Sequence, residues 1–147
     1  MTDRIALDTG PLGMATHPRA NKSAAEWLRS MLESDVEVLI PEIADYELRR
    51  NYILEGFKES IERLDQLIAA LGYCPIDTAT MRRAAQFWAD SRSRHTPTGH
   101  PKELDGDAIL AAQARQAGAT VVTDNVGHLS QFVETKKWSE MGFGYDD

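Results

Sequence analysis

Four acidic residues occupy positions where carboxylates could act together. Asp8 and Asp124 each directly follow a short apolar run typical of a buried strand, whereas Glu47 and Asp107 lie in segments with helical spacing. Carboxylates held close together repel one another unless a cation neutralises them, and hard oxygen ligands suit Mg²⁺ or Mn²⁺. We therefore expect Asp8, Glu47 and Asp107 to hold a divalent cation.

The chemistry that such a site supports is phosphoryl transfer. A bound divalent cation lowers the pKa of a water ligand, which makes it a nucleophile near neutral pH, and it shields phosphate charge. No covalent protein intermediate is required. Hydrolysis of a phosphodiester is the expected reaction.

Each acid also has an ordinary structural explanation. Glu47 borders the apolar face of its helix, but it could simply pair with the neighbouring Arg49 or Arg50, which are themselves candidates for binding phosphate. Asp105 and Asp107 begin an alanine-rich segment, where acids commonly cap a helix. Residues two apart on a helix point in nearly opposite directions, so we expect Asp105 to be the cap or an auxiliary residue and Asp107 the ligand.

The elements that must position these acids alternate along the chain. Strand-like runs cover 5–7, 36–40, 73–76 and 119–122, and helical spacing covers 23–33, 43–50, 61–71, 81–88 and 105–117, with a loop expected at 91–101. Alternation of this kind favours a parallel sheet with helices on both faces. Ligands of such sheets bind beyond the carboxyl ends of the strands, where Asp8 and Asp124 are expected.

Composition narrows the class of protein. The 147 residues are 42% hydrophobic and 27% charged, which predicts one globular domain over 1–147. The sequence has no apolar run long enough for a bilayer and a charged rather than apolar N-terminus, so we expect a cytoplasmic protein without a membrane partner. A single Cys74 excludes an internal disulfide, and a net charge of −7 argues against coating nucleic acid by bulk charge.

The acidic positions lie in four short motifs. They are Leu7-Asp8-Thr9, Tyr46-Glu47-Leu48-Arg49-Arg50, Asp107-Ala108-Ile109-Leu110-Ala111-Ala112 and Val122-Thr123-Asp124-Asn125-Val126-Gly127-His128-Leu129. Each motif is weak alone, but their order and spacing across nearly the whole chain resemble those of the PIN-domain ribonucleases. Within that superfamily the chain most resembles the VapC-type toxins of toxin-antitoxin pairs.

The resemblance implies a three-layer α/β/α sandwich with a central parallel sheet, an endoribonuclease that depends on Mg²⁺ or Mn²⁺, a homodimer, and inhibition by a cognate antitoxin. Asp8, Glu47 and Asp107 match the family's first three acids. The fourth position falls on Asp124 or Asn125, and the two alternatives remain open. Thr123 resembles a hydroxyl that helps to hold the acids, and Thr9 is expected to serve similarly after Asp8.

Two functions from different classes remain. The first is a metal-dependent endoribonuclease that acts as a toxin on RNA, and the second is a PIN-like module that has lost activity and binds RNA or a protein. A flap-type DNA nuclease would use a related acidic site but needs additional elements that this chain lacks room for. The RNA target cannot be read from the sequence, because RNA is recognised through loop shape and base stacking.

Overall fold

The computed structural model describes residues 3–19, 22–94, 101–124, 126–127 and 129–141. Five strands alternate with helices along the chain. The strands are β1 (Arg4–Leu7), β2 (Glu37–Pro41), β3 (Gly72–Cys74), β4 (Thr120–Thr123) and β5 (Thr135–Lys137). The helices are α1 (Thr9–Thr16), α2 (Lys22–Leu32), α3 (Glu42–Glu55), α4 (Lys58–Ala70), α5 (Thr78–Arg94) and α6 (Pro101–Ala117), with short 3₁₀ turns η1 (Leu129–Gln131) and η2 (Trp138–Glu140).

The five strands form one parallel sheet in the order β3-β2-β1-β4-β5. β1 lies at its centre, with Ile5 opposite both Val38 of β2 and Thr120 of β4. All neighbouring strands run the same way, so their carboxyl ends share one edge of the sheet. The predicted parallel sheet is therefore confirmed, and β1 and β4 end side by side with Asp8 and Asp124 just beyond them.

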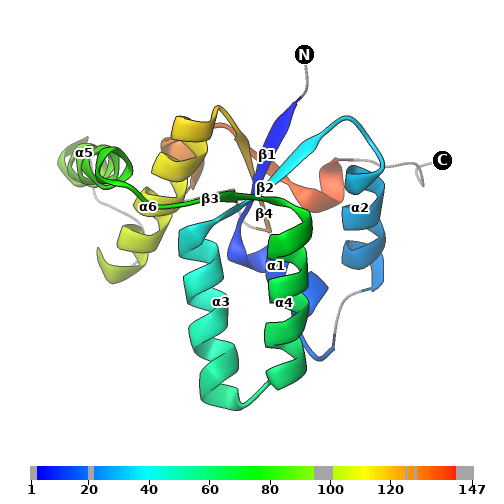
Figure 1. Cartoon of the computed structure of the whole chain (residues 1–147). Coiled ribbons are helices and arrows are strands. Elements are labelled where there is room, and N and C mark those ends of the chain that lie inside the picture. Colours follow the sequence, from blue (N-terminus) through cyan, green and yellow to red (C-terminus); the bar gives the residue numbers. More distant parts are fainter. Residues whose placement is uncertain (1–2, 20–21, 95–100, 125, 128, 142–147) are drawn as a thin grey trace.

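Helices cover both faces of the sheet, which confirms the three-layer α/β/α architecture. α5 packs on α6, and α6 packs on β1, β2 and β4. α1 packs on α2 and α4, which contact β2 and β3 respectively. Figure 1 shows α5 and α6 on one side of the sheet and α2 on the other, with α3 and α4 extending together below it. α3 contacts α1, α4 and α6, so it adjoins helices from both layers.

The central strands are apolar on both faces, as a covered parallel sheet requires. Ile5, Ala6 and Leu7 of β1 are all buried, and they pack in one cluster with Val121 and Val122 of β4. Burying such side chains contributes roughly 1.5–3 kcal/mol each relative to exposure. This core fixes β1 against β4 and thereby fixes the positions of the acids that follow them.

Several elements differ from the sequence-based expectation. The Gly10-Pro11 pair after Asp8 is typical of a turn. The structure has the helix α1 there instead, because Asp8 caps it and Pro11 falls in its first turn, where no backbone N–H is required. The loop expected at 91–101 is helical through Arg94, and α6 begins at Pro101, at the first helical position that proline favours. Residues 95–100 lie outside the described part of the chain.

Asp105 therefore lies inside α6 and is not its cap, which corrects the role expected for it. The strand β5 was also not expected. Its three residues, Thr135, Lys136 and Lys137, are polar and lie at the sheet edge, where they bury little and leave no apolar pattern in the sequence.

Within the described residues, no helix combines the length and the apolar character that crossing a membrane requires.

The α3–α4 connection depends on a left-handed backbone at Gly56. Its φ is 76°, and its N–H donates to the carbonyl of Ile53, 3.2 Å away, at the end of α3. A Cβ added there would meet no other atom within 4 Å, so backbone strain is the only cost of a side chain. We predict that Gly56→Ala lowers the free energy of unfolding by about 1 kcal/mol, measured by urea denaturation. The neighbouring Glu55→Ala should change the free energy of unfolding by less. Equal effects of the two substitutions would show that a side chain at position 56 causes no backbone strain.

Candidate active site

Asp8 is held at the carboxyl end of β1 by groups from α1 and β4. Its backbone N–H donates to the carbonyl of Val122, 2.9 Å away. Its Oδ1 accepts hydrogen bonds from the Thr9 N–H at 2.7 Å and the Thr9 hydroxyl at 3.3 Å, while its Oδ2 accepts one from the buried Thr123 hydroxyl at 2.8 Å. Both predicted hydroxyl residues therefore contact Asp8. A carboxylate has about four acceptor positions, so Asp8 keeps capacity for a further ligand.

Glu47 and Asp107 approach Asp8 from two other helices. Glu47 lies on α3 and Asp107 on α6. Burial raises the pKa of Glu47 above its ordinary value, the negative charges of Asp8 and Asp107 raise that pKa further, and the positive charge of Arg50 opposes them. The structure thus brings Asp8 and Asp107 within electrostatic reach of Glu47.

Gly106 provides the space that Glu47 occupies beside α6. A Cβ built on Gly106 would lie 2.5 Å from Glu47 Oε2, closer than real Cβ atoms come to other atoms. The α6 backbone therefore passes directly against the Glu47 carboxylate, one residue from Asp107. The glycine between Asp105 and Asp107 indicates such a close approach in the sequence, because glycine weakens a helix and needs another reason to be there.

Asp124 lies beside the first turn of α1, close to Gly10. A Cβ on Gly10, in the first turn of α1, would overlap the Asp124 carboxylate. Burial raises the pKa of Asp124, and the charge of Asp8 raises it further, whereas a hydrogen bond from Trp138 and the charge of Lys137 lower it. Asp124 is thus electrostatically coupled to Asp8, and Asn125 lies outside the described residues. We call Asp8, Glu47, Asp107 and Asp124 the acidic site.

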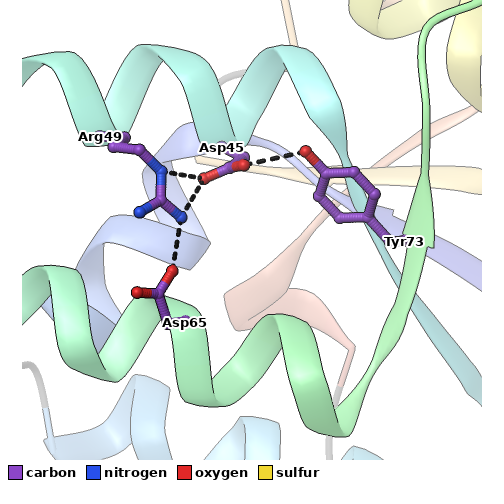
Figure 2. A network of polar contacts seen from close by, with 4 residues as sticks. All are labelled: Asp45, Arg49, Asp65 and Tyr73. Carbon is purple, nitrogen blue, oxygen red and sulfur yellow. Dashed lines mark hydrogen bonds and ion pairs between the residues drawn. The ribbon is translucent and has the colours of Figure 1, made fainter.

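The two arginines expected to bind RNA have different surroundings. Figure 2 shows the Arg49 guanidinium between two carboxylates, at 2.9 Å from Asp45 and 2.7 Å from Asp65, and Asp45 also accepts a 2.9 Å hydrogen bond from Tyr73. Its charge is therefore already neutralised within the fold. Arg50 is exposed, lies 5.1 Å from the centre of the Tyr46 ring, and is the arginine whose charge acts on Glu47.

Asp105 is turned away from the other acids. It is exposed and lines a depression between α5 and α6, together with Met81 and Trp88. This placement follows from the helix, because residues two apart on α6 point in nearly opposite directions and Asp107 interacts with Glu47. Asp105 is not among the charges that act on Glu47, whereas Asp8 and Asp107 are.

The oxygen donors of these acids suit a hard cation. Their spacing in this structure suits it less well. Among the residues that the structure describes, no three His, Cys, Asp or Glu side chains stand close enough to enclose a metal ion. The donors are nevertheless all carboxylate oxygens, which Mg²⁺ and Mn²⁺ prefer, and the room left at Gly106 places one of them beside α6. Burial is the largest cause of the raised pKa of Glu47, and the charges of Asp8 and Asp107, which a cation would offset, add to it. The residues therefore fit a divalent cation.

Comparison with known proteins shows the family of this chain. The model of the PIN domain matches residues 5–131, a range that contains the whole acidic site. The chain belongs to the PIN-domain family. It is 30% identical over 129 residues to Toxin FitB of Neisseria gonorrhoeae, covering 84% of this chain and 88% of that protein.

Solved structures agree with the PIN fold. The crystal structure of VapBC2 from Rickettsia felis bound to a promoter DNA fragment superposes with a TM-score of 0.74 at 15% identity, covering 92% of this chain and 98% of that one. The structure of FitAB bound to the IR36 DNA fragment superposes with a TM-score of 0.73 at 23% identity, covering 96% and 99%.

Trp138 lies beyond the residues that the PIN model matches. It belongs to η2, packs against the buried Trp27 ring at 6.2 Å between centroids, and donates its hydrogen bond to Asp124. No local pattern in the sequence connects it with Asp124, because the contact depends on β5 returning the chain to the sheet. Sequence reasoning missed this residue together with that strand.

The raised pKa of Glu47 predicts a pH-dependent cost to stability. A carboxyl group whose pKa is higher in the folded state binds more protons when folded, so its contribution to stability falls as pH rises above about 4.5, its ordinary value. We predict that Glu47→Gln raises the free energy of unfolding at pH 7 and that this gain shrinks towards pH 4.5. Urea denaturation in chelator across this range measures it. The exposed Glu62→Gln on α4 is the control, and a Glu47→Gln gain independent of pH would contradict the coupling.

Proposed function

We propose that this PIN domain is a metal-dependent endoribonuclease and the toxin of a toxin-antitoxin pair. The observation that carries the nuclease proposal is the coupling of three carboxylates from separate elements, Asp8 after β1, Glu47 on α3 and Asp107 on α6. Repulsion among them serves no structural purpose. It is the expected property of a site that binds a divalent cation.

Asp8, Glu47 and Asp107 are the residues that would hold Mg²⁺ or Mn²⁺. Bound there, the cation would supply an activated water and charge shielding for a phosphodiester. The Thr9 and Thr123 hydroxyls hold the two Asp8 oxygens in fixed directions, so that Asp8 need not reorganise when substrate arrives. Each of these roles belongs to a residue on the edge formed by the strand ends.

For the fourth acidic position we propose Asp124 rather than Asn125. The coupling of Asp124 to Asp8 supports this choice, and the Trp138 hydrogen bond holds its carboxylate towards the site. A carboxylate there can accept a hydrogen bond from water or from a nucleotide hydroxyl. Asp124 would thus orient groups around Asp8.

Arg50 is the residue we propose for contact with an RNA phosphate. It is exposed, its charge acts on Glu47, and its guanidinium carries five N–H donors that suit a phosphate. Arg49 is left out of this role because Asp45 and Asp65 already bind it. With a net charge of −7, the chain needs such local cations to bring a polyanion to an acidic site.

The toxin proposal rests on the relatives. The curated relative is named a toxin, and the similar structures are of VapBC2 and FitAB, each bound to DNA. By this likeness the chain would bind a cognate antitoxin that contacts promoter DNA. The expected homodimer and a cytoplasmic location belong to the same proposal.

The nuclease proposal predicts opposite outcomes for two acids on one helix. Asp107→Asn and Asp8→Asn should lower Mn²⁺-dependent RNA cleavage by a factor on the order of 10² or more, because each removes a metal ligand. Asp105→Asn, two residues away on α6, should leave cleavage near the wild-type rate. Cleavage of a mixed set of single-stranded and structured RNAs, with Mn²⁺ affinity by calorimetry, measures both. A wild-type protein that binds no Mn²⁺ and cleaves none of these RNAs would support the inactive binding module instead.

The partner proposal predicts a stable complex. Co-expression with the short reading frame beside this gene should yield a complex in which RNA cleavage falls at least tenfold, while light scattering of the chain alone should give the mass of a homodimer. Binding of the complex, and not of the chain alone, to the promoter DNA would complete the test. A monomeric protein whose RNA cleavage is unchanged by the product of that reading frame would contradict the toxin role and leave the nuclease role intact.

A further inference from the structure

Gln113 is a buried amide that joins three elements. It lies on α6, is 2% exposed, and belongs to no motif of the acidic site. Its Oε1 accepts a hydrogen bond from the backbone N–H of Ile43 at 3.1 Å, and its Nε2 donates one to the carbonyl of Cys74 at 2.5 Å. One side chain therefore ties α6 to the first turn of α3 and to the end of β3.

The first turn of α3 needs a partner of this kind. α3 begins after Pro41, which makes no side-chain cap hydrogen bond, and the first N–H groups of a helix have no partner within it. Gln113 supplies an acceptor to one of them from another helix. Glu42 fixes the same end of α3, because its Oε1 accepts a 2.6 Å hydrogen bond from the N–H of Ile76.

Two contacts then fix α3 against α6. The first joins Ile43 to Gln113, and the second brings Glu47 against the backbone at Gly106. From the first contact to the second, α3 advances four residues, or about 6 Å, while α6 runs back seven residues, or about 10 Å. The two helices therefore run in opposite directions past each other, and the second contact falls where Glu47 and Asp107 meet.

We infer that Gln113 is a positioning residue that sets the spacing of Glu47 on α3 and Asp107 on α6. The inference rests on the proposed function for its consequence, since that spacing matters only where the acids hold a cation. Both of these Gln113 hydrogen bonds are made to backbone atoms, of Ile43 and Cys74, and not to either acid. The effect of Gln113 is to prevent the acid-bearing helices from sliding or separating under the repulsion of their carboxylates.

Gln113→Met tests this in the full-length chain, because methionine keeps the length and volume of the side chain and loses both hydrogen bonds. Gln113→Glu keeps an acceptor for Ile43 and serves as the conservative variant. Ser91→Ala is the matched control, since Ser91 of α5 is also buried, at 3% exposed, and donates a 2.7 Å hydrogen bond to Gln131 of η1, a contact that does not involve α3.

Two measurements separate positioning from mere stabilisation. In metal-free protein, Gln113→Met should speed hydrogen exchange of the Ile43 amide at least tenfold and shift the backbone amide resonances of Glu47 and Asp107, and Ser91→Ala should do neither. In calorimetry, Mn²⁺ affinity should fall about tenfold in Gln113→Met, less in Gln113→Glu, and stay unchanged in Ser91→Ala.

The inference is overturned if the folded Gln113→Met protein keeps the wild-type amide resonances of Glu47 and Asp107, or if Ser91→Ala shifts them equally. Should Gln113→Met not fold, the same comparison is made with Gln113→Glu. If the wild-type protein binds no Mn²⁺, the proposed function fails, and the metal-free resonances still decide whether Gln113 sets the spacing.

Discussion

Repulsion among carboxylates is the constraint around which this fold is organised. Four acids from four segments lie towards the carboxyl ends of β1 and β4. Burial first, and then the charges of neighbouring acids, raise the pKa values of Glu47 and Asp124, while Arg50, Lys137 and Trp138 only oppose these shifts. A fold can hold such groups together only where the surrounding packing is stable enough to outweigh the repulsion. The apolar strands at the sheet centre supply that packing, and they lie directly behind Asp8 and Asp124.

The groups that hold these acids come from distant parts of the chain. Thr123 reaches Asp8 across 115 residues of sequence, Gln113 reaches Ile43 across 70, and Trp138 reaches Asp124 from η2. Polar contacts between remote segments form only when the whole sheet has assembled. The geometry of the acidic site is consequently a property of the complete fold and not of any one motif, and disturbance of a remote element such as β5 should reach Asp124 through Trp138.

The sequence was sufficient for those parts of the molecule that depend on local pattern. The apolar runs before Asp8 and Asp124 correctly predicted two strand ends at one edge of a parallel sheet. Local pattern did not predict α1, because its glycines and proline are typical of a turn. The helix is explained by Asp8, which caps it. Local pattern failed too for Trp138, because the sequence does not show which distant side chain will reach Asp124. The separate roles of Arg49 and Arg50 likewise depend on where α4 places Asp65.

α3 carries Glu47 and packs against helices of both layers. Repulsion between Glu47 and the neighbouring acids therefore acts directly on the position of this helix. The helix is restrained on two sides by networks of different kinds. Towards α4 and β3, Arg49 lies between Asp45 and Asp65 while Tyr73 donates to Asp45, so charge is matched by opposite charge (Figure 2). Towards α6, the neutral amide of Gln113 makes the connection, and Glu47 faces further carboxylates. A charged side chain in place of Gln113 would add to the electrostatic field at Glu47. The neutral amide restrains α3 and leaves the negative field of the acidic site available to a cation.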